Sequence, residues 1–308
     1  VPVARVLVYP LADGFSAFVS TTPAALVRSV RAVLEPATGP VVFAGGTNQN
    51  FADINRDRPT DPALAGLCVA ASPTVHAADD ASIVENIEGL AEVVRFAREI
   101  GDGRSVHVSP ITLATRFGPY PGGPALPGDL PAPVDPRQAS LLGAAWTAGA
   151  IGALAGAGAT SATFYETTGW RGVVELDDGS PMPDRFPSRP GAVHPLFHVL
   201  ADVAEWREGR VRSLAVSDPL AVTGVAVELA GSLGVLAANV TPEPQRVRIE
   251  GLTGADARIR VLDEASAVGA LRDPARFRAD AGASVPIEDG ALLLALPPYA
   301  IARVVARA

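Results

Sequence analysis

The stretch Ser161-Ala-Thr-Phe-Tyr-Glu-Thr-Thr-Gly-Trp170 joins a short β-prone run to a carboxylate and a large aromatic residue. The run predicts a strand that ends near Tyr165, with Glu166 at its carboxyl end and Trp170 in the loop that follows. Enzymes built on βα-barrels place their catalytic groups at the carboxyl ends of the strands, so Glu166 is a candidate catalytic residue. The alternative is a carboxylate at the end of a strand that is merely solvated.

Four further β-prone runs precede this stretch: Arg5–Tyr9, Pro40–Ala44, Gly66–Ala70 and Ser105–Ser109. Helical patterns follow all of the five runs except the second, which a polar loop follows; they cover Ala25–Leu34, Ser82–Ile100, Arg137–Ala157 and Pro195–Trp206. We expect Thr22 to cap the first of these helices. A strict alternation of strands and helices predicts a parallel sheet with its helices outside.

Five strand–helix units could form either an open doubly wound sheet or part of a closed barrel. No glycine-rich phosphate loop follows the first strand, which argues against the open sheet. Polar loops follow every strand, as in a barrel whose site lies at one face. A closed barrel of this class has eight strands, so we expect about three more upstream of Val1. The predicted fold class is α/β, the C-terminal part of a (β/α)8 TIM barrel with five βα units visible.

The pattern changes after Trp206 to short β-prone runs separated by turn residues. They are Gly224–Leu229, Gly234–Val240, Gln245–Glu250, Ala257–Val261, Ala291–Ala295 and Tyr299–Val305. Spacings of roughly 8–12 residues with alternating apolar positions are typical of a β-sandwich. We place the boundary near Glu208-Gly209, which divides the chain into a partial barrel domain over 1–208 and an all-β sandwich domain over 209–308.

Composition narrows the possible partners. The net charge is −8 and no run of lysine or arginine occurs, which argues against nucleic acid and anionic membranes. Cys68 is the single cysteine, so neither an internal disulfide nor a cysteine-based zinc site is expected. No metal or cofactor motif is present, and we expect neither. No signal peptide is visible, which suggests a cytoplasmic protein, and the oligomeric state stays open.

Polar residues follow the second and third strands. Asn48, Asp53, Asn55 and Arg56 lie in a loop, Thr47–Pro62, that suits a ligand rich in hydroxyl and carboxyl groups. The alternative is a turn in which Asn and Asp satisfy their own backbone.

His76 follows the third strand beside Asp79 and Asp80, and is a candidate catalytic residue whose tautomer a carboxylate could fix. Asp79 is a candidate for substrate binding, whereas Asp80 could cap the next helix and Glu85 could complement its dipole.

Arg116, in the loop after the fourth strand, and Tyr165 and Trp170, around the end of the fifth, complete the candidates for substrate binding. The remaining histidines are weaker candidates. His107 lies within the fourth strand, and its side chain could face either the barrel interior or the helices.

Several motifs together resemble those of the D-apionate lactonases over about Val3 to Trp206. They are Gly45-Gly-Thr-Asn48, Pro73-Thr-Val-His-Ala77, Ser109-Pro-Ile-Thr-Leu113, Asp135-Pro-Arg-Gln138 and Tyr165-Glu-Thr-Thr-Gly-Trp-Arg-Gly172. The resemblance implies a glycosidase-like barrel followed by a β-sandwich. It also implies hydrolysis of a sugar lactone, D-apionolactone to D-apionate, in D-apiose catabolism.

Hydrolysis of a lactone is acyl transfer to water, which needs a base or nucleophile, an oxyanion stabiliser and groups that bind hydroxyls. We assign the first role to Glu166 and the second to His76 or Arg116. Candidates for the hydroxyl-binding groups are Asn48, Asn55 and Arg56, with Trp170 as an apolar wall for the sugar ring.

Two alternatives stay open. The first is a retaining glycoside hydrolase of the TIM-barrel type, in which Glu166 acts with a second carboxylate, either Asp53, Asp79 or Glu85 or a residue of the strands expected upstream of Val1. The second is a carbohydrate-binding module without catalytic activity.

Overall fold

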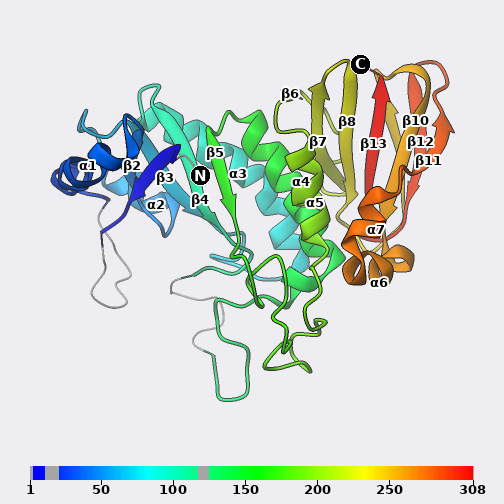
Figure 1. The fold of residues 1–308 in the computed structure, drawn as a ribbon, viewed down its shortest axis with the longest axis horizontal. Helices are drawn as coiled ribbons and strands as arrows, with labels where there is room; N and C mark the ends of the chain where they lie inside the picture. The colour runs from blue at the N-terminus through cyan, green and yellow to red at the C-terminus, as the bar shows by residue number, and fades with distance from the viewer. Residues whose placement is uncertain (1–2, 11–20, 117–124, 308) are drawn as a thin grey trace.

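The computed structural model describes residues 3–10, 21–116 and 125–307. Figure 1 shows a parallel sheet with its helices beside an antiparallel β-structure that contains the C-terminus. The strands of the parallel sheet are β1 (Arg5–Val8), β2 (Val42–Gly46), β3 (Gly66–Ala71), β4 (Ser105–Ile111) and β5 (Ser161–Phe164). They lie in the order β1-β2-β3-β4-β5, and every neighbouring pair is parallel. The predicted half-barrel of five strand–helix units is confirmed.

Four helices follow strands of this sheet as predicted: α1 (Ala24–Thr38), α3 (Asp80–Ile100), α4 (Leu141–Gly156) and α5 (Leu196–Glu205). Two short helical segments differ from the prediction. The loop expected over Thr47–Pro62 contains α2 (Phe51–Arg56), because Asn50 and Asp53 form a capping box that supports one and a half turns. The helix expected from Arg137 is interrupted at Ser140, which ends the 3-10 turn η1 (Pro136–Ala139) and caps α4.

The prediction that Thr22 caps α1 is wrong. Pro23 occupies the cap position, and no side chain caps this helix. The Thr22 hydroxyl donates instead to the carbonyl oxygens of Val8, at 2.7 Å, and Gly46, at 3.1 Å. These buried bonds tie the start of α1 to the carboxyl ends of β1 and β2.

The strand register decides which way His107 points. His107 lies in register with Cys68 and Ser161, so the three side chains share one face of the sheet. Val69, Val106 and Val108 occupy the opposite face and pack in the core with α3 and α4.

His107 therefore faces the barrel interior. Its Nδ1 lies 2.9 Å from Ser161 Oγ and its Nε2 lies 3.0 Å from Ser105 Oγ. Burial, together with the guanidinium of Arg5, lowers the pKa of His107.

The C-terminal part is a β-sandwich, as predicted. Its larger sheet has the order β11-β10-β13-β8-β7-β6, and the smaller pairs β12 with β9. The strands are β6 (Arg210–Arg212), β7 (Val222–Leu229), β8 (Ser232–Asn239), β9 (Gln245–Glu250), β10 (Thr253–Leu262), β11 (Ala283–Pro286), β12 (Ala291–Leu296) and β13 (Ile301–Arg307). The short β6 and β11 were not predicted. Two helices, α6 (Glu264–Arg272) and α7 (Pro274–Ala279), connect β10 to β11.

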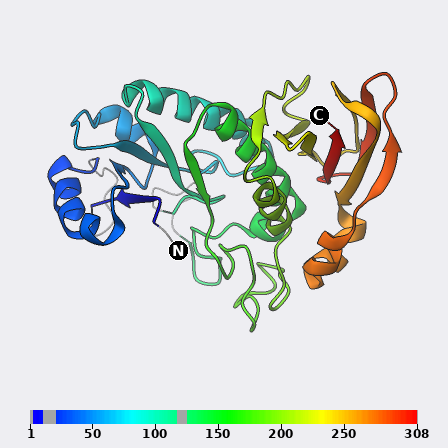
Figure 2. The same cartoon turned by 45° about the horizontal axis from the view of Figure 1, so that its top comes forward.

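Helix α4 joins the two halves of the molecule. It is apolar on nearly all sides, and in both views of the ribbon it lies between the parallel sheet and the sandwich (Figures 1 and 2). Its Gly152 approaches β7 so closely that a Cβ there would lie 2.0 Å from the carbonyl oxygen of Gly224. Within the described residues, no helix combines the length and apolar character needed to cross a bilayer.

Candidate functional site

The backbone turns sharply at the end of β5. Tyr165 has a φ of 58°, in the left-handed region that a bulky residue seldom adopts. Two hydrogen bonds hold it there. Its backbone N–H donates to the Ile111 carbonyl at 2.9 Å, and its hydroxyl lies 2.7 Å from Thr147 Oγ1 in α4. The ring is 8% exposed and burial raises the pKa of the hydroxyl, so the Tyr165 side chain belongs to the core.

Glu166 follows directly and is paired with an arginine. Arg171 Nη2 lies 2.8 Å from Glu166 Oε1, and the Glu166 side chain is 41% exposed. The backbone N–H of Glu166 also donates to the Arg171 carbonyl at 3.0 Å, which closes the turn between them. Gln138, only 3% exposed, supports this turn by donating from Nε2 to the Gly172 carbonyl at 2.8 Å.

Trp170 lies in the same turn and is half-buried. Its ring meets Phe186 edge to face, with the ring centroids 6.4 Å apart, and Phe186 is fully buried. Glu175 is 2% exposed and accepts hydrogen bonds from the Leu176 N–H, at 2.8 Å, and from the Ser188 hydroxyl. The long loop after β5 is therefore held in place by its own buried groups.

Two predicted residues meet at the carboxyl ends of β2 to β4. Asn48 and Arg116 line a small cavity of about 10 Å³ together with Ser72 and Thr112. Loops from different strands thus converge on one edge of the sheet, as a barrel predicts.

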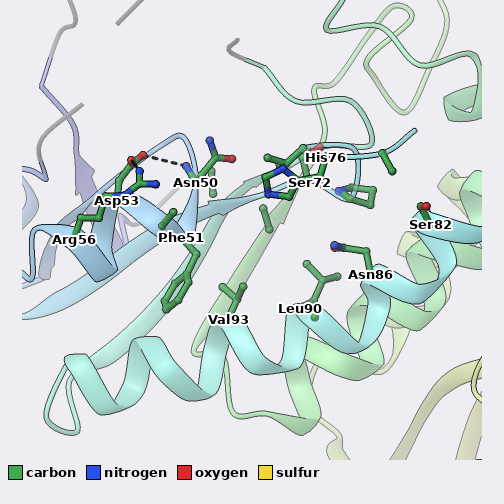
Figure 3. A pocket seen from close by; sticks show the side chains of 17 residues that line it. Asn50, Phe51, Asp53, Arg56, Ser72, His76, Ser82, Asn86, Leu90 and Val93 are labelled. Carbon is green, nitrogen blue, oxygen red and sulfur yellow. Dashed lines mark hydrogen bonds and ion pairs between the residues drawn. The ribbon is translucent and has the colours of Figure 1, made fainter. Parts of the chain in front are cut away.

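Three others line a larger pocket between α2 and α3, with a volume of about 620 Å³ (Figure 3). They are Asp53, Arg56 and His76. Asp53 is 6% exposed, and its Oδ1 lies 3.7 Å from Arg56 Nη1. Burial raises the pKa of Asp53. Glu166, Trp170 and Arg171 are not among the residues that line this pocket.

The remaining candidates lie outside both cavities. Asn55 is exposed and accepts a hydrogen bond from Arg58 Nη2 at 3.0 Å. Asp79, rather than Asp80, caps α3: its carboxylate accepts from Ser82 N at 2.9 Å and from Ser82 Oγ at 2.7 Å. These bonds lower the pKa of Asp79. Asp80 pairs with Arg137 at 2.8 Å, and Glu85 is exposed on α3.

The sequence did not single out Arg171, Gln138, Phe51 or Asn86. Arg171 and Gln138 both lie in motifs that carry the family resemblance, so their place in those motifs was the available signal. Phe51 and Asn86 line the larger pocket only because α2 packs beside α3. No cluster of His, Cys, Asp and Glu suited to a metal ion occurs in residues 3–10, 21–116 and 125–307.

Comparison with solved structures supports the fold. A family 51 α-L-arabinofuranosidase from Bifidobacterium longum superimposes with a TM-score of 0.56 and 14% sequence identity, over 92% of this chain and 63% of that one. A GH30 endoxylanase from Clostridium papyrosolvens gives a TM-score of 0.54 and 10% identity, over 92% of this chain and 61% of that one. At such identities the likeness concerns the fold alone.

Comparison of sequences identifies the family. The chain is 26% identical over 214 residues to a D-apionate lactonase from Brucella anthropi. That match covers 67% of this chain but 33% of the relative, so the chain spans about a third of the length of the curated relative it matches. Residues 1–208 match the D-apionate lactonase TIM barrel domain, and residues 219–304 match the D-apionate lactonase C-terminal immunoglobulin-like domain. The chain therefore belongs to the D-apionate lactonase family.

Proposed function

We propose that this chain forms part of an enzyme that hydrolyses a sugar lactone of the D-apionolactone type to the open acid, with Glu166 as the general base. The observation that carries the proposal is the Glu166–Arg171 pair at the carboxyl end of β5, 2.8 Å between Oε1 and Nη2. In a βα-barrel this is the edge of the sheet where substrates are bound. The relative from Brucella anthropi is named a D-apionate lactonase, which supports the choice of substrate.

The pair offers the base and the oxyanion donor that the reaction needs. The Glu166 carboxylate accepts a proton from water, and the water oxygen attacks the lactone carbonyl to give a tetrahedral anion. Arg171 uses Nη2 for Glu166 and can direct another N–H to the oxyanion, because its side chain makes no other hydrogen bond or ion pair in the described part of the chain. The carbon–oxygen bond of the ring then breaks, and the ring oxygen leaves as a hydroxyl with the proton that Glu166 accepted.

Among the carboxylates of this chain, none of the three candidates is placed to act with Glu166 as in a glycoside hydrolase, which favours a lactonase. A retaining glycosidase needs two carboxyl groups about 5 Å apart. The charged partner of Glu166 is a guanidinium, whereas the carboxylates considered as second groups have other positions. Asp53 is buried in the cap of α2, Asp79 caps α3, and Glu85 is exposed on α3.

The proposed substrate-binding residues are chosen by their position near the carboxyl ends of the strands. Asn48 and Arg116, which line one cavity at the strand ends, are proposed to bind the substrate hydroxyls. Trp170, anchored on Phe186, is proposed as the apolar wall for the sugar ring. Such an enzyme would act on a small metabolite, in keeping with a cytoplasmic role in carbohydrate catabolism and with no need for a nucleic-acid or membrane partner.

A direct assay tests the proposal. The purified protein is offered D-apionolactone and simple pentonolactones in a pH-stat, and aryl glycosides in parallel. We expect acid release from a lactone, with Glu166→Gln reducing kcat by about 10²–10⁴-fold. Turnover of the glycosides without any lactone hydrolysis would overturn the proposal in favour of the glycosidase, and an unchanged kcat in Glu166→Gln would remove Glu166 from the mechanism.

A further inference from the structure

The pocket between α2 and α3 has the build of a ligand site of its own. Its volume of about 620 Å³ falls in the range of small-molecule sites. Phe51, Leu90 and Val93 form an apolar wall, and the side chains of His76 and Asn86 lie at the rim (Figure 3). Helices far apart from the β5 turn supply most of the lining, and none of the residues that hold Glu166 contributes to it.

Two polar side chains at this pocket have no hydrogen-bond partner among the described residues. Neither the His76 imidazole nor the Asn86 amide makes a hydrogen bond to any residue that the structure describes. They come from different elements, His76 from the loop after β3 and Asn86 from the second turn of α3, yet they line the same space. An imidazole and a carboxamide together supply donors and acceptors for hydroxyl groups.

The absence of a side chain at Gly89 leaves the pocket between α2 and α3 open. This glycine lies inside α3, where glycine is less favourable than alanine. A Cβ at Gly89 would meet only the Asn86 side chain, at 3.7 Å or more, so packing does not require a glycine there. Gly89 does line the pocket, and any larger side chain at this position would project into it.

The charge at the pocket favours a neutral ligand over an ion. Asp53 and Arg56 lie at one end and pair with each other at 3.7 Å, so their charges balance. An apolar wall next to uncharged donors and acceptors matches a sugar ring, which has an apolar face of C–H groups and a rim of hydroxyls.

We propose that the pocket between α2 and α3 is a second carbohydrate-binding site, which takes a neutral sugar ring against Phe51, Leu90 and Val93 and binds its hydroxyls through His76 and Asn86. The site is independent of Glu166 and would bind whether or not the protein hydrolyses lactones. It gives the protein a place to hold a sugar unit away from the β5 turn.

The test measures binding of one neutral probe, methyl β-D-xylopyranoside, by isothermal titration or by ligand-observed NMR. We expect saturable binding to the unaltered protein and to Glu166→Gln, at least roughly tenfold weaker binding to Gly89→Leu, and weaker binding to Asn86→Leu. Gly269→Leu is the matched control, because Gly269 lies on an exposed face of α6 and a Cβ there meets nothing within 4 Å. Gly89→Leu and Gly269→Leu should both unfold at a thermal midpoint no lower than that of the unaltered protein, since leucine is a better helix former than glycine.

Three results would overturn this proposal. They are the absence of saturable binding, binding that Gly89→Leu leaves unchanged, and binding of D-gluconate in place of the xyloside, which would mark an anion site. The lactone assay on Glu166→Gln tests the proposed lactone hydrolysis separately. Binding to the pocket with no lactone turnover would overturn only the proposed function, and turnover without binding would overturn only this second site.

Discussion

Arg171 Nη2 lies 2.8 Å from Glu166 Oε1, and the backbones of the same two residues are joined by a hydrogen bond of 3.0 Å. Double attachment at side chain and backbone fixes the carboxylate relative to the guanidinium. Both side chains are partly exposed, at 41% for Glu166 and 34% for Arg171, so an ion pair of this kind contributes little to stability. A catalytic role for the Glu166–Arg171 pair at the end of β5 therefore explains this arrangement better than a contribution to stability does.

Replacement of Arg171 therefore should affect turnover far more than folding. We expect Arg171→Gln to lower kcat for lactone hydrolysis by about 10–10³-fold, because an oxyanion donor and the partner of the base are lost together. The free energy of unfolding should fall by less than about 1 kcal/mol. Steady-state kinetics and urea titration measure the two quantities.

Arg189→Gln is the control for this experiment. Arg189 lies in the same long loop, is exposed, and its side chain makes no hydrogen bond or ion pair within the described residues. Its replacement should leave kcat unchanged. An equal loss of activity in both variants would mean that the net charge of the loop matters, rather than the pair with Glu166.

The Gln138 side chain is hydrogen-bonded to the turn that carries Glu166 and Arg171. Its replacement tests whether turnover depends on the position of this turn. In Gln138→Met the buried Gly172 carbonyl loses the hydrogen bond of 2.8 Å, which should cost about 1–3 kcal/mol of stability. We also expect kcat to fall while KM changes less, since the Glu166–Arg171 turn loses its position.

The control is Gln245→Met in the sandwich, where the glutamine amide donates to Thr241 Oγ1 at 3.0 Å. That variant should lose stability and keep the kcat of the unaltered protein. Equal kcat values for the two variants would show that Gln138 is structural only.

Much of the fold could be predicted because most strands are rich in β-prone residues and α3 is long and periodic. Short β-prone runs identified the strands of both domains, alternating apolar positions indicated the sandwich, and a helical stripe identified α3. Shorter elements carry too few residues for a period to show. α2 has six residues and forms because Asn50 and Asp53 cap it, and β6 is an exposed Arg-Val-Arg segment at the edge of a sheet.

The candidate site was predictable only in part. Glu166 and Trp170 could be placed because residues that follow parallel strands gather at one edge of the sheet. Arg171 could not be paired with Glu166 in advance, since their contact depends on the left-handed turn at Tyr165. For Asp79 the sequence could not choose between two roles, because a carboxylate beside a strand end suits both a substrate site and the cap of the next helix, and in the structure it caps α3.

Gly152 provides a test of the contact between the two domains. A methyl group in Gly152→Ala would lie 2.0 Å from the Gly224 carbonyl oxygen, which belongs to the backbone of β7 and cannot rotate away. We expect the variant to lose about 1–3 kcal/mol of stability through overpacking.

Gly156→Ala is the matched control in the same helix, where a Cβ meets nothing within 4 Å. That variant should gain up to about 1 kcal/mol, because alanine is the better helix former. Thermal or urea unfolding of both variants measures the contrast, and equal effects would show that α4 and β7 separate easily.

His198 should make stability depend on pH. It is 2% exposed in α5, its Nε2 lies 3.1 Å from the Ala270 carbonyl, and its Nδ1 has no partner among the described residues. Burial lowers the pKa of His198 from 6.5 to about 4, and the nearby guanidiniums of Arg260 and Arg278 act in the same direction. The folded state therefore prefers the neutral ring, so stability is complete above about pH 6.5 and is lost as the pH falls toward 4.

The loss amounts to about 3 kcal/mol at pH 4, from the difference between the two pKa values. His107 and His194 also have lowered pKa values through burial, so the pH profile of the unaltered protein combines several groups. His198→Gln isolates one of them, because a glutamine amide can donate to the Ala270 carbonyl but does not titrate. Urea unfolding at pH 7 and pH 4 should show the variant gaining about 3 kcal/mol relative to the unaltered protein on acidification. Parallel pH profiles for the two proteins would show that His198 accepts a proton in the folded state as readily as in the unfolded chain.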